Sequence, residues 1–302
     1  MGIVFFVLGM AVLILFWITL HDTTHFEISE YRVTDPRIKK SFRAVVLSDL
    51  HSQQFGRDNE LLLAAIREGK PDLVLITGDM ITAKPGRGVD VALSLIRKLS
   101  EEYPICHGVG NHEHRIMLYR KDYGDLCWRY ERALKECGAG MMHNKRREFE
   151  ELGVDVVGSQ IHHRYYLRGT KTPMSATYLP RNLGTPKEER FTVLLAHNPD
   201  YFPEYAAWGA DLVLSGHVHG GVARIPFWNR GVISPGIKFF PKYDGGLFSE
   251  GKSHMILSRG LGCHTIPVRV FNPGDLIFLE FSPGEAGVEK LSPKKKAGIK
   301  KS

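Results

Sequence analysis

The stretch RAVVLSDLH at residues 43–51 joins a run of aliphatic residues to an aspartate and a histidine. Four later stretches repeat this pattern, in which a short apolar run ends in side chains that bind metals or move protons: LVLITGD (73–79), ICHGVGNHE (105–113), TVLLAH (192–197) and LVLSGHVH (212–219). Short apolar runs that stop at glycines or polar residues are typical of buried strands. The sequence therefore predicts five buried strands, each followed directly by chemically active residues.

Segments with helical periodicity lie between the first strands. Apolar residues recur at three- and four-residue spacing in 59–68 and 89–99, and a further amphipathic segment covers 125–137. Alternating strands and helices predict parallel strands and an α/β fold. Further strands are predicted at 154–158, 255–258 and 276–281, and an edge strand at 26–33.

The polar residues that end the strands are expected to meet, because ligands of open α/β sheets bind beyond the carboxyl ends of the strands. Carboxylate, amide and imidazole ligands suit Mn²⁺, Fe and Zn²⁺. One carboxylate can bridge two ions about 3.5–4 Å apart. Each residue alone could be a cap, a turn or a surface residue, but the ordered set favours a metal site. The candidates are Asp49, His51, Asp79, Asn111, His112, Glu113, His197, His217 and His219.

Composition excludes several protein classes. The 302 residues are 43% hydrophobic and 24% charged, which is ordinary for a globular protein. The four cysteines contain no CxxC pair, which argues against a disulfide scaffold or a thiolate zinc site. The net charge of +7 resides mostly in a C-terminal run of lysines, so the rest of the chain is close to neutral: Lys290, Lys294, Lys295, Lys296, Lys300 and Lys301.

The first residues favour a membrane anchor. Residues 3–20 carry no charge, and as a helix they would span about 27 Å, close to the thickness of a bilayer core. A secretory signal peptide fits less well, since no Lys or Arg precedes the run and no small-x-small cleavage site follows. A buried core helix is the third interpretation. We predict an anchor at 1–22, a juxtamembrane segment at 23–40, a catalytic domain at 41–282 and a basic tail at 283–302. These segments predict a single-pass protein of the cell membrane. They do not decide on which side of the membrane the catalytic domain lies.

The motifs D-x-H, G-D, G-N-H-E, a lone His and G-H-x-H occur in this order across 41–282 and resemble those of the calcineurin-like metallophosphoesterases. The phrases at 71–73, 196–200, 214–217 and 258–262 resemble a membrane-anchored bacterial subgroup that includes cell-wall phosphodiesterases and UDP-diacylglucosamine pyrophosphatases. The resemblance implies a four-layer α/β/β/α sandwich with metals at the sheet edges, preceded here by one transmembrane helix.

The resemblance also implies roles for individual residues. One ion would be held by Asp49, His51, Asp79 and His219, and a second by Asp79, Asn111, His197 and His217. Asp79 would bridge the ions, His112 would donate a proton, and Glu113 would orient His112. Many relatives have Gln where this chain has Val222. The long interval between Asn111 and His197 leaves room for a cap, and residues 160–182, with four basic residues among tyrosines, are either that cap or a mobile surface loop.

The implied activity is hydrolysis of a phosphodiester or pyrophosphate by two divalent ions, with Mn²⁺ favoured over Zn²⁺ or Fe. The expected substrate is a phosphorylated small molecule or a lipid-linked one such as UDP-2,3-diacylglucosamine, and the membrane is an expected partner. A nuclease or a phosphomonoesterase of the same fold is the alternative. The neutral body and the anchor argue against nucleic acid as a partner. A non-catalytic scaffold is disfavoured because all seven metal positions and His112 are present.

Overall fold

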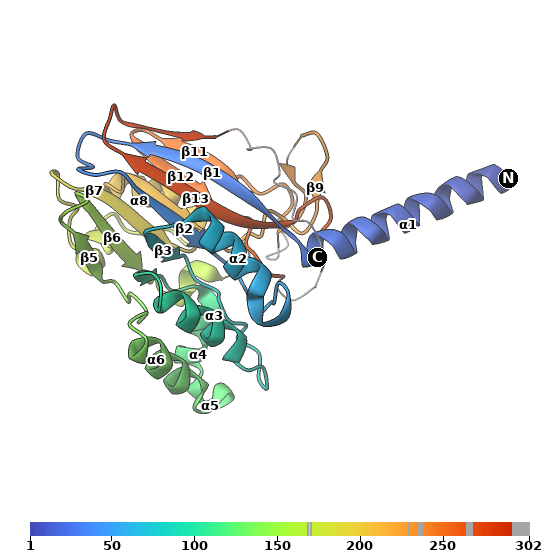
Figure 1. The fold of residues 1–302 in the computed structure, drawn as a ribbon, viewed down its shortest axis with the longest axis horizontal. Coiled ribbons are helices and arrows are strands. Elements are labelled where there is room, and N and C mark those ends of the chain that lie inside the picture. Colours follow the sequence, from blue (N-terminus) through green and yellow to red (C-terminus); the bar gives the residue numbers. More distant parts are fainter. Residues whose placement is uncertain (168, 170, 229, 235–237, 264–267, 292–302) are drawn as a thin grey trace.

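The computed structural model describes residues 1–302 except 168, 170, 229, 235–237, 264–267 and 292–302 (Figure 1). Two six-stranded sheets form its centre, in the strand orders β14-β1-β13-β2-β3-β4 and β11-β12-β8-β7-β6-β5. The first contains β1 (Phe26–Thr34), β2 (Phe42–Leu47), β3 (Leu73–Ile76), β4 (Ile105–His107), β13 (Gly274–Ser282) and β14 (Gly287–Lys290). The second contains β5 (Arg146–Phe149), β6 (Val154–Ser159), β7 (Phe191–Ala196), β8 (Leu212–Ser215), β11 (Gly246–Glu250) and β12 (Ser253–Leu257).

Helices connect the strands, and α2 (Glu60–Gly69), α3 (Asp90–Ser100) and α6 (Leu126–Glu136) lie where the periodicity predicts them. Helices also form in segments where the periodicity predicted none: α4 (Asn111–Leu118), α5 (Arg120–Tyr123), α7 (Tyr178–Leu183) and α8 (Phe202–Trp208). The pairs β2–β3, β3–β4, β6–β7 and β7–β8 are parallel. The predicted mixed α/β fold is therefore confirmed, with its strands divided between two sheets.

The apolar runs serve two cores at once because successive strand residues point to opposite faces. In β2, Val45 and Leu47 join a cluster with the side chains of α2, α3 and α6. Ala44 and Val46 join a different cluster, shared with β6, β7 and β8 of the other sheet. A third cluster lies between the second sheet and α7 and α8. Burial of each valine or leucine side chain contributes about 1.5–3 kcal/mol.

Strand β1 differs from the expectation of an edge strand. It lies inside the first sheet, parallel to β13 along its whole length and antiparallel to β14. Strand β14 ends at Lys290, so the start of the predicted basic tail also belongs to the sheet. The other five lysines of that tail lie outside the described residues.

The N-terminal helix α1 (Gly2–Thr24) projects away from the two sheets (Figure 1). Its 23 residues extend about 35 Å, and its apolar side chains are exposed. The predicted apolar helix is confirmed. Its length and composition fit a membrane span and also a signal sequence. The inner end contacts the folded body, where the Asp22 side chain is buried.

Candidate metal centre

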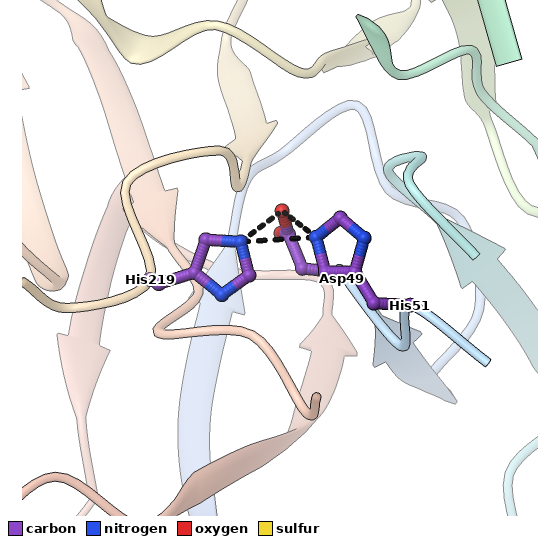
Figure 2. Close-up of side chains that lie close together, drawn as sticks. All are labelled: Asp49, His51 and His219. Atoms are coloured by element: carbon purple, nitrogen blue, oxygen red, sulfur yellow. Dashed lines mark hydrogen bonds and ion pairs between the residues drawn. The ribbon is translucent and has the colours of Figure 1, made fainter. Parts of the chain in front are cut away.

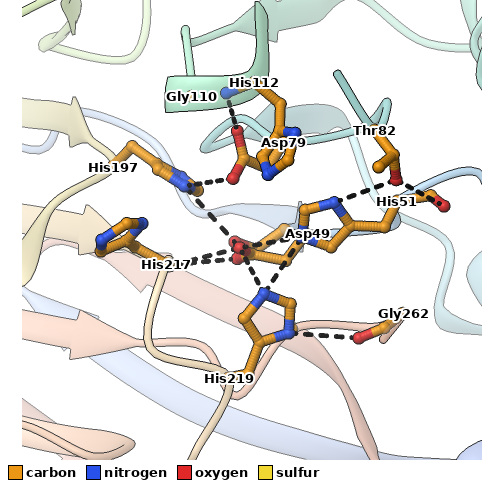
Figure 3. Close-up of polar contacts among 12 residues, drawn as sticks. Asp49, His51, Asp79, Thr82, Gly110, His112, His197, His217, His219 and Gly262 are labelled. Atoms are coloured by element: carbon orange, nitrogen blue, oxygen red, sulfur yellow. Dashed lines mark hydrogen bonds and ion pairs between the residues drawn. The ribbon is translucent and has the colours of Figure 1, made fainter. Parts of the chain in front are cut away.

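Five chain segments bring their polar side chains to one place, each directly after a strand (Figure 3). Asp49 and His51 follow β2, Asp79 follows β3, and Asn111 begins α4 after β4. His197 follows β7, and His217 and His219 follow β8. Both sheets thus contribute to the same site, as the strand-end pattern predicts.

The first group of side chains is formed by Asp49, His51 and His219 (Figure 2). The Nε2 atoms of His51 and His219 lie 3.1 Å apart. They are 3.8 and 3.3 Å from Asp49 Oδ1. All three side chains are buried, and one ligand atom of each lies within 4.8 Å of the others, so together they could hold one cation.

The second group is formed by Asp79, His197 and His217. His197 Nε2 lies 3.0 Å from Asp79 Oδ2 and 3.7 Å from Asp49 Oδ1, so it faces both carboxylates. Asn111 follows Gly110, which lies against Asp79. It is half-buried, and its Oδ1 atom has no hydrogen-bond partner among the described residues. A third grouping joins His51, Asp79 and His112 within the same 4.8 Å limit, which places Asp79 next to the first group as well.

The electrostatics of these groups fit a divalent cation. Asp49 and Asp79 are fully buried carboxylates, and within the described part of the chain their ion pairs are with histidines only. Burial opposes a charge on His197, but the carboxylates of Asp79 and Asp49 outweigh it and raise its pKa to about 9. Buried charges are tolerated when they are paired or bind metals. The donor set therefore fits the divalent metal that the motifs predict.

The backbone at the site is held in an unusual conformation. Five of the predicted ligands have positive φ angles, between 49° and 74°: Asp49, His51, Asp79, His217 and His219. Such angles cost non-glycine residues on the order of 1–3 kcal/mol each, and they cluster at functional sites. The fold thus accepts local strain in order to direct these side chains toward one another.

Two glycines allow close approach to the carboxylates. A Cβ atom on Gly110 would lie 2.1 Å from Asp79 Oδ1, and one on Gly216 would lie 2.1 Å from Asp49 Oδ2. Without side chains there, backbone N–H groups reach the acids: His112 donates to Asp79 Oδ1 at 2.7 Å, and His217 donates to both Asp49 oxygens at 3.1 Å. These bonds fix the orientation of each carboxylate.

Glu113 shapes the loop that carries Asp79. Its buried carboxylate accepts hydrogen bonds from the backbone N–H groups of Asp79 (2.8 Å), Met80 (2.9 Å) and Gly110 (3.0 Å). Burial and the nearby Asp79 carboxylate raise the pKa of Glu113 to about 8. The contacts place Glu113 as a support for the Asp79 loop, whereas its expected action on the His112 ring stays a prediction.

His112 is oriented by the backbone. Its Nδ1 atom accepts the N–H of Ala83 at 2.7 Å. A neutral ring in this arrangement carries its proton on Nε2. The ring lies edge-on to His51, with centroids 4.8 Å apart.

The segment 160–182 packs against the second sheet through Ile161, Tyr165 and Leu179. The ring of Tyr166, the last residue of a short 3-10 helix (His163–Tyr166), lies 5.3 Å from the His217 ring and 6.4 Å from the His197 ring. Of the four basic residues in this candidate cap, Lys171 pairs with Glu204 and Arg164 donates to the Tyr165 hydroxyl. Arg181 is exposed, and Arg168 lies outside the described residues. Among the described residues of this segment, Tyr166 thus adjoins the candidate ligands.

Two buried residues that support the site have no recognisable motif. Arg269 donates to the carbonyls of Arg259, Gly260 and Gly262, and Gly262 in turn donates to the Asp49 carbonyl. The Asn272 amide donates to the carbonyls of His219 (2.8 Å) and Gly221 (2.6 Å). The Asn272 backbone N–H donates to the Asp22 carboxylate at the end of α1 (2.9 Å). The signal that could have revealed them is weak: polar residues in a loop outside every strand-end motif.

We expect Asn272→Ala to lower the free energy of unfolding by about 2–4 kcal/mol, because two buried carbonyls would lose their donor. The measurement is a urea titration of the full chain in detergent, followed by circular dichroism. Asn182→Ala is the control, since Asn182 is exposed and also bonds one carbonyl through its amide; its effect should stay within about 0.5 kcal/mol. Equal unfolding curves for the two variants would contradict the role of Asn272.

Comparisons with known proteins agree with the geometry. The sequence profile of the family "Calcineurin-like phosphoesterase" matches residues 42–221. The chain is 28% identical over 240 residues to the uncharacterized metallophosphoesterase YkuE of Bacillus subtilis, which covers 76% of this chain and 74% of that protein. It is also 28% identical over 236 residues to the phosphodiesterase YaeI of Escherichia coli, with coverage of 73% and 75%.

Among solved structures, TT1561 of Thermus thermophilus matches with a TM-score of 0.44 and 14% identity, over 72% of this chain and 88% of that one. The family profile spans more than half of the chain and includes all five strand-end motifs, whose side chains the structure brings together. The chain therefore belongs to the calcineurin-like phosphoesterase family and is a phosphoester hydrolase with a divalent metal site.

Proposed function

We propose that this protein is a membrane-anchored phosphodiesterase or pyrophosphatase that uses two divalent ions. The observation that carries the proposal is the pair of adjacent ligand groups, one with Asp49 and the other with Asp79. A ligand atom of His51, in the first group, lies within 4.8 Å of one of Asp79, in the second. The four-layer α/β/β/α order is part of the proposal, supported by the three separate apolar clusters.

In the proposed ligand sets, one ion is held by Asp49, His51, Asp79 and His219, and the other by Asp79, Asn111, His197 and His217. The unpartnered Asn111 oxygen and the buried nitrogens of His197 support the second set. Asp79 would contribute to both sets, since its carboxylate is close to members of both groups. Oxygen and imidazole donors without thiolate favour Mn²⁺, with Zn²⁺ or Fe as alternatives.

Divalent ions bound here would activate water for attack on phosphorus and neutralise charge on the phosphoryl oxygens. The residues of the chain do the rest. His112, held by the Ala83 N–H at Nδ1, presents its Nε2 proton to the leaving oxygen. The Tyr166 ring lies 5.3 Å from the His217 ring, where it would contact the group that the phosphate carries.

The proposed substrate is lipid-linked, of the kind represented by UDP-2,3-diacylglucosamine. Three observations support this choice: the exposed apolar helix α1, the sequence phrases that resemble membrane-anchored enzymes, and the phosphodiesterase activity in the name of YaeI. We place α1 in the cell membrane as a single span.

The test uses the full chain, stripped of metal with a chelator and reloaded with Mn²⁺. We expect Mn²⁺-dependent hydrolysis of bis(p-nitrophenyl) phosphate in detergent, faster than hydrolysis of p-nitrophenyl phosphate. In nanodiscs that contain UDP-2,3-diacylglucosamine, we expect release of UMP at a higher kcat/KM than for the soluble diester. The reason is that the anchor holds enzyme and substrate in one bilayer, where their encounter is confined to the membrane surface.

Three outcomes would contradict parts of the proposal. A preference for the monoester would point to a phosphomonoesterase, and cleavage of single- or double-stranded DNA in place of the diester would point to a nuclease. Equal turnover of the lipid substrate in nanodiscs and in dilute detergent would remove the argument for a membrane substrate.

A further inference from the structure

Exposed aromatic side chains gather in the loops between β8 and β13. Phe227 and Trp228 lie in the turn between β9 (Arg224–Ile225) and β10 (Arg230–Gly231). Phe239 and Phe240 follow shortly after, and Phe271 precedes β13. All five are exposed, and the Trp228 side chain is 76% accessible. We call these residues the aromatic lobe.

Backbone hydrogen bonds hold the aromatic lobe together. Val222 donates to Ile233, and Val232 donates to Ala223, which closes the β9–β10 turn. Phe240 donates to Val232 at 2.9 Å, and this bond fixes the second aromatic pair beside the turn. Arg224 and Val270 are linked in the same way, as Arg224 donates to the Val270 carbonyl at 3.0 Å. The five aromatic residues therefore belong to one connected substructure.

The same substructure is bonded to the inner end of α1. The Asn272 N–H donates to the Asp22 carboxylate, and the Arg269 N–H donates to the Thr23 hydroxyl at 3.3 Å. Gln53, two residues beyond His51, donates to the Thr23 carbonyl at 2.6 Å. In Figure 1 the loops around β9 are drawn on the same side of the body as the point where α1 joins it.

This position sets the depth of the lobe if α1 spans a bilayer, as the proposed function holds. The uncharged run 3–20 fills the bilayer core of about 30 Å, so the last turn of α1, which includes Asp22 and Thr23, lies at the headgroup level. Loops bonded to that turn lie at the same level. Trp and Phe side chains favour the membrane interface.

We propose that the aromatic lobe inserts into the lipid interface around α1 and forms a second membrane contact that sets the orientation of the catalytic body. The sheet register gives this contact a consequence for the metal site. Val46 of β2 pairs with Ile277, and Ile28 of β1 pairs with the adjacent Leu276. The carboxyl end of β2, which leads to Asp49, therefore lies at the edge of the sheet where α1 enters. The lobe holds that edge at the bilayer.

The experiment measures tryptophan quenching by brominated phosphatidylcholine in the full chain, reconstituted in phosphatidylcholine–phosphatidylglycerol nanodiscs. The chain has four tryptophans. Trp17→Phe removes the one in α1 and leaves Trp128, Trp208 and Trp228. We expect this variant to remain quenched, more strongly by lipid brominated at carbons 6 and 7 than by lipid brominated at carbons 11 and 12. Adding Trp228→Phe should abolish the quenching.

The matched control adds Trp128→Phe to Trp17→Phe. Trp128 is 59% exposed but belongs to α6, far from α1 in Figure 1. Its removal should increase the quenched fraction of the emission, since an unquenched emitter is lost. Unchanged quenching after removal of Trp228 would overturn the proposal. So would cross-linking of wild-type protein into a dimer that the Trp228 variant no longer forms, because the lobe would then be covered by a second copy.

Other arms of the experiment separate this proposal from the proposed function. Trp17 lies in α1, so wild type should lose more emission to brominated lipid than Trp17→Phe does. Equal quenching of the two proteins would refute the anchor. Hydrolysis of bis(p-nitrophenyl) phosphate by wild type with Mn²⁺ reports the chemistry independently of any membrane contact. The Trp228 and Trp128 variants should hydrolyse this soluble diester at the wild-type rate.

Discussion

Asp79→Asn is expected to abolish the hydrolysis of phosphodiesters and to remove both metal ions. Metal-ion catalysis contributes several kcal/mol of transition-state stabilisation, so activity should fall by about 10³-fold or more. The asparagine side chain is close in shape to that of aspartate. Its amide oxygen can still accept the His112 N–H that Asp79 Oδ1 accepts at 2.7 Å. The loss therefore comes from the missing charge and the missing second oxygen donor.

The measurement is elemental analysis of protein dialysed against Mn²⁺, together with the rate on bis(p-nitrophenyl) phosphate. Asp155→Asn is the control, because Asp155 is also a buried carboxylate but lies at the start of β6 and pairs with Arg146 at 2.9 Å. It should retain both ions. Two ions in the Asp79 variant would contradict the bridging role, whereas loss of only one would assign Asp79 to a single site.

The strands and the convergence of the candidate ligands could be predicted because the information is local. In RAVVLSDLH, the aliphatic residues serve two cores from one strand, and the polar residues begin where the strand ends. The parallel order of β2, β3 and β4 then brings Asp49, Asp79 and Asn111 to the same edge without any further signal. The strand-end positions of His197 and His217 follow from the same rule in the second sheet.

The position of β1 could not be predicted, because it depends on partners far along the chain. Its own sequence looks like an edge strand, with charged residues among apolar ones. The structure pairs it with β13, from Phe26 opposite Gly274 to Thr34 opposite Ser282, and with β14 on its other side. Nothing in local periodicity specifies a partner near the other end of the chain, since such pairing is decided by the packing of the whole sheet.

The residues that hold the loops of the site could not be predicted for a different reason. Asn272, Arg269 and Glu113 act by satisfying backbone groups of loops, and such bonds depend on how loops meet in three dimensions. Glu113 illustrates this. Its motif suggested an action on His112, but nothing in its sequence position indicated that it accepts hydrogen bonds from the N–H groups of Asp79 and Met80. The positive φ angles of the candidate ligands explain why these supports are required: strained loops need many fixed contacts.

His112→Asn separates proton transfer from metal binding. An asparagine oxygen can accept the Ala83 N–H that His112 Nδ1 now accepts at 2.7 Å, so the local structure should persist. Asparagine cannot donate a proton to the leaving oxygen, and loss of one general acid costs about 10²–10⁴-fold in rate.

The size of that loss should depend on the leaving group. For p-nitrophenolate, which leaves without protonation, we expect the rate to fall toward the lower end of the range, and for an alkyl leaving group of high pKa toward the upper end. The measurement is kcat for a series of diesters with different leaving groups, with metal content determined in parallel. His254→Asn, a partly buried histidine on β12 bonded to Ser249, is the control and should match wild type throughout. Because His112 also lies within ligand distance of His51 and Asp79, loss of an ion would make it a ligand. An equal rate loss across leaving groups would contradict the general-acid role, whereas a graded loss with two ions retained leaves proton donation as the function of this side chain.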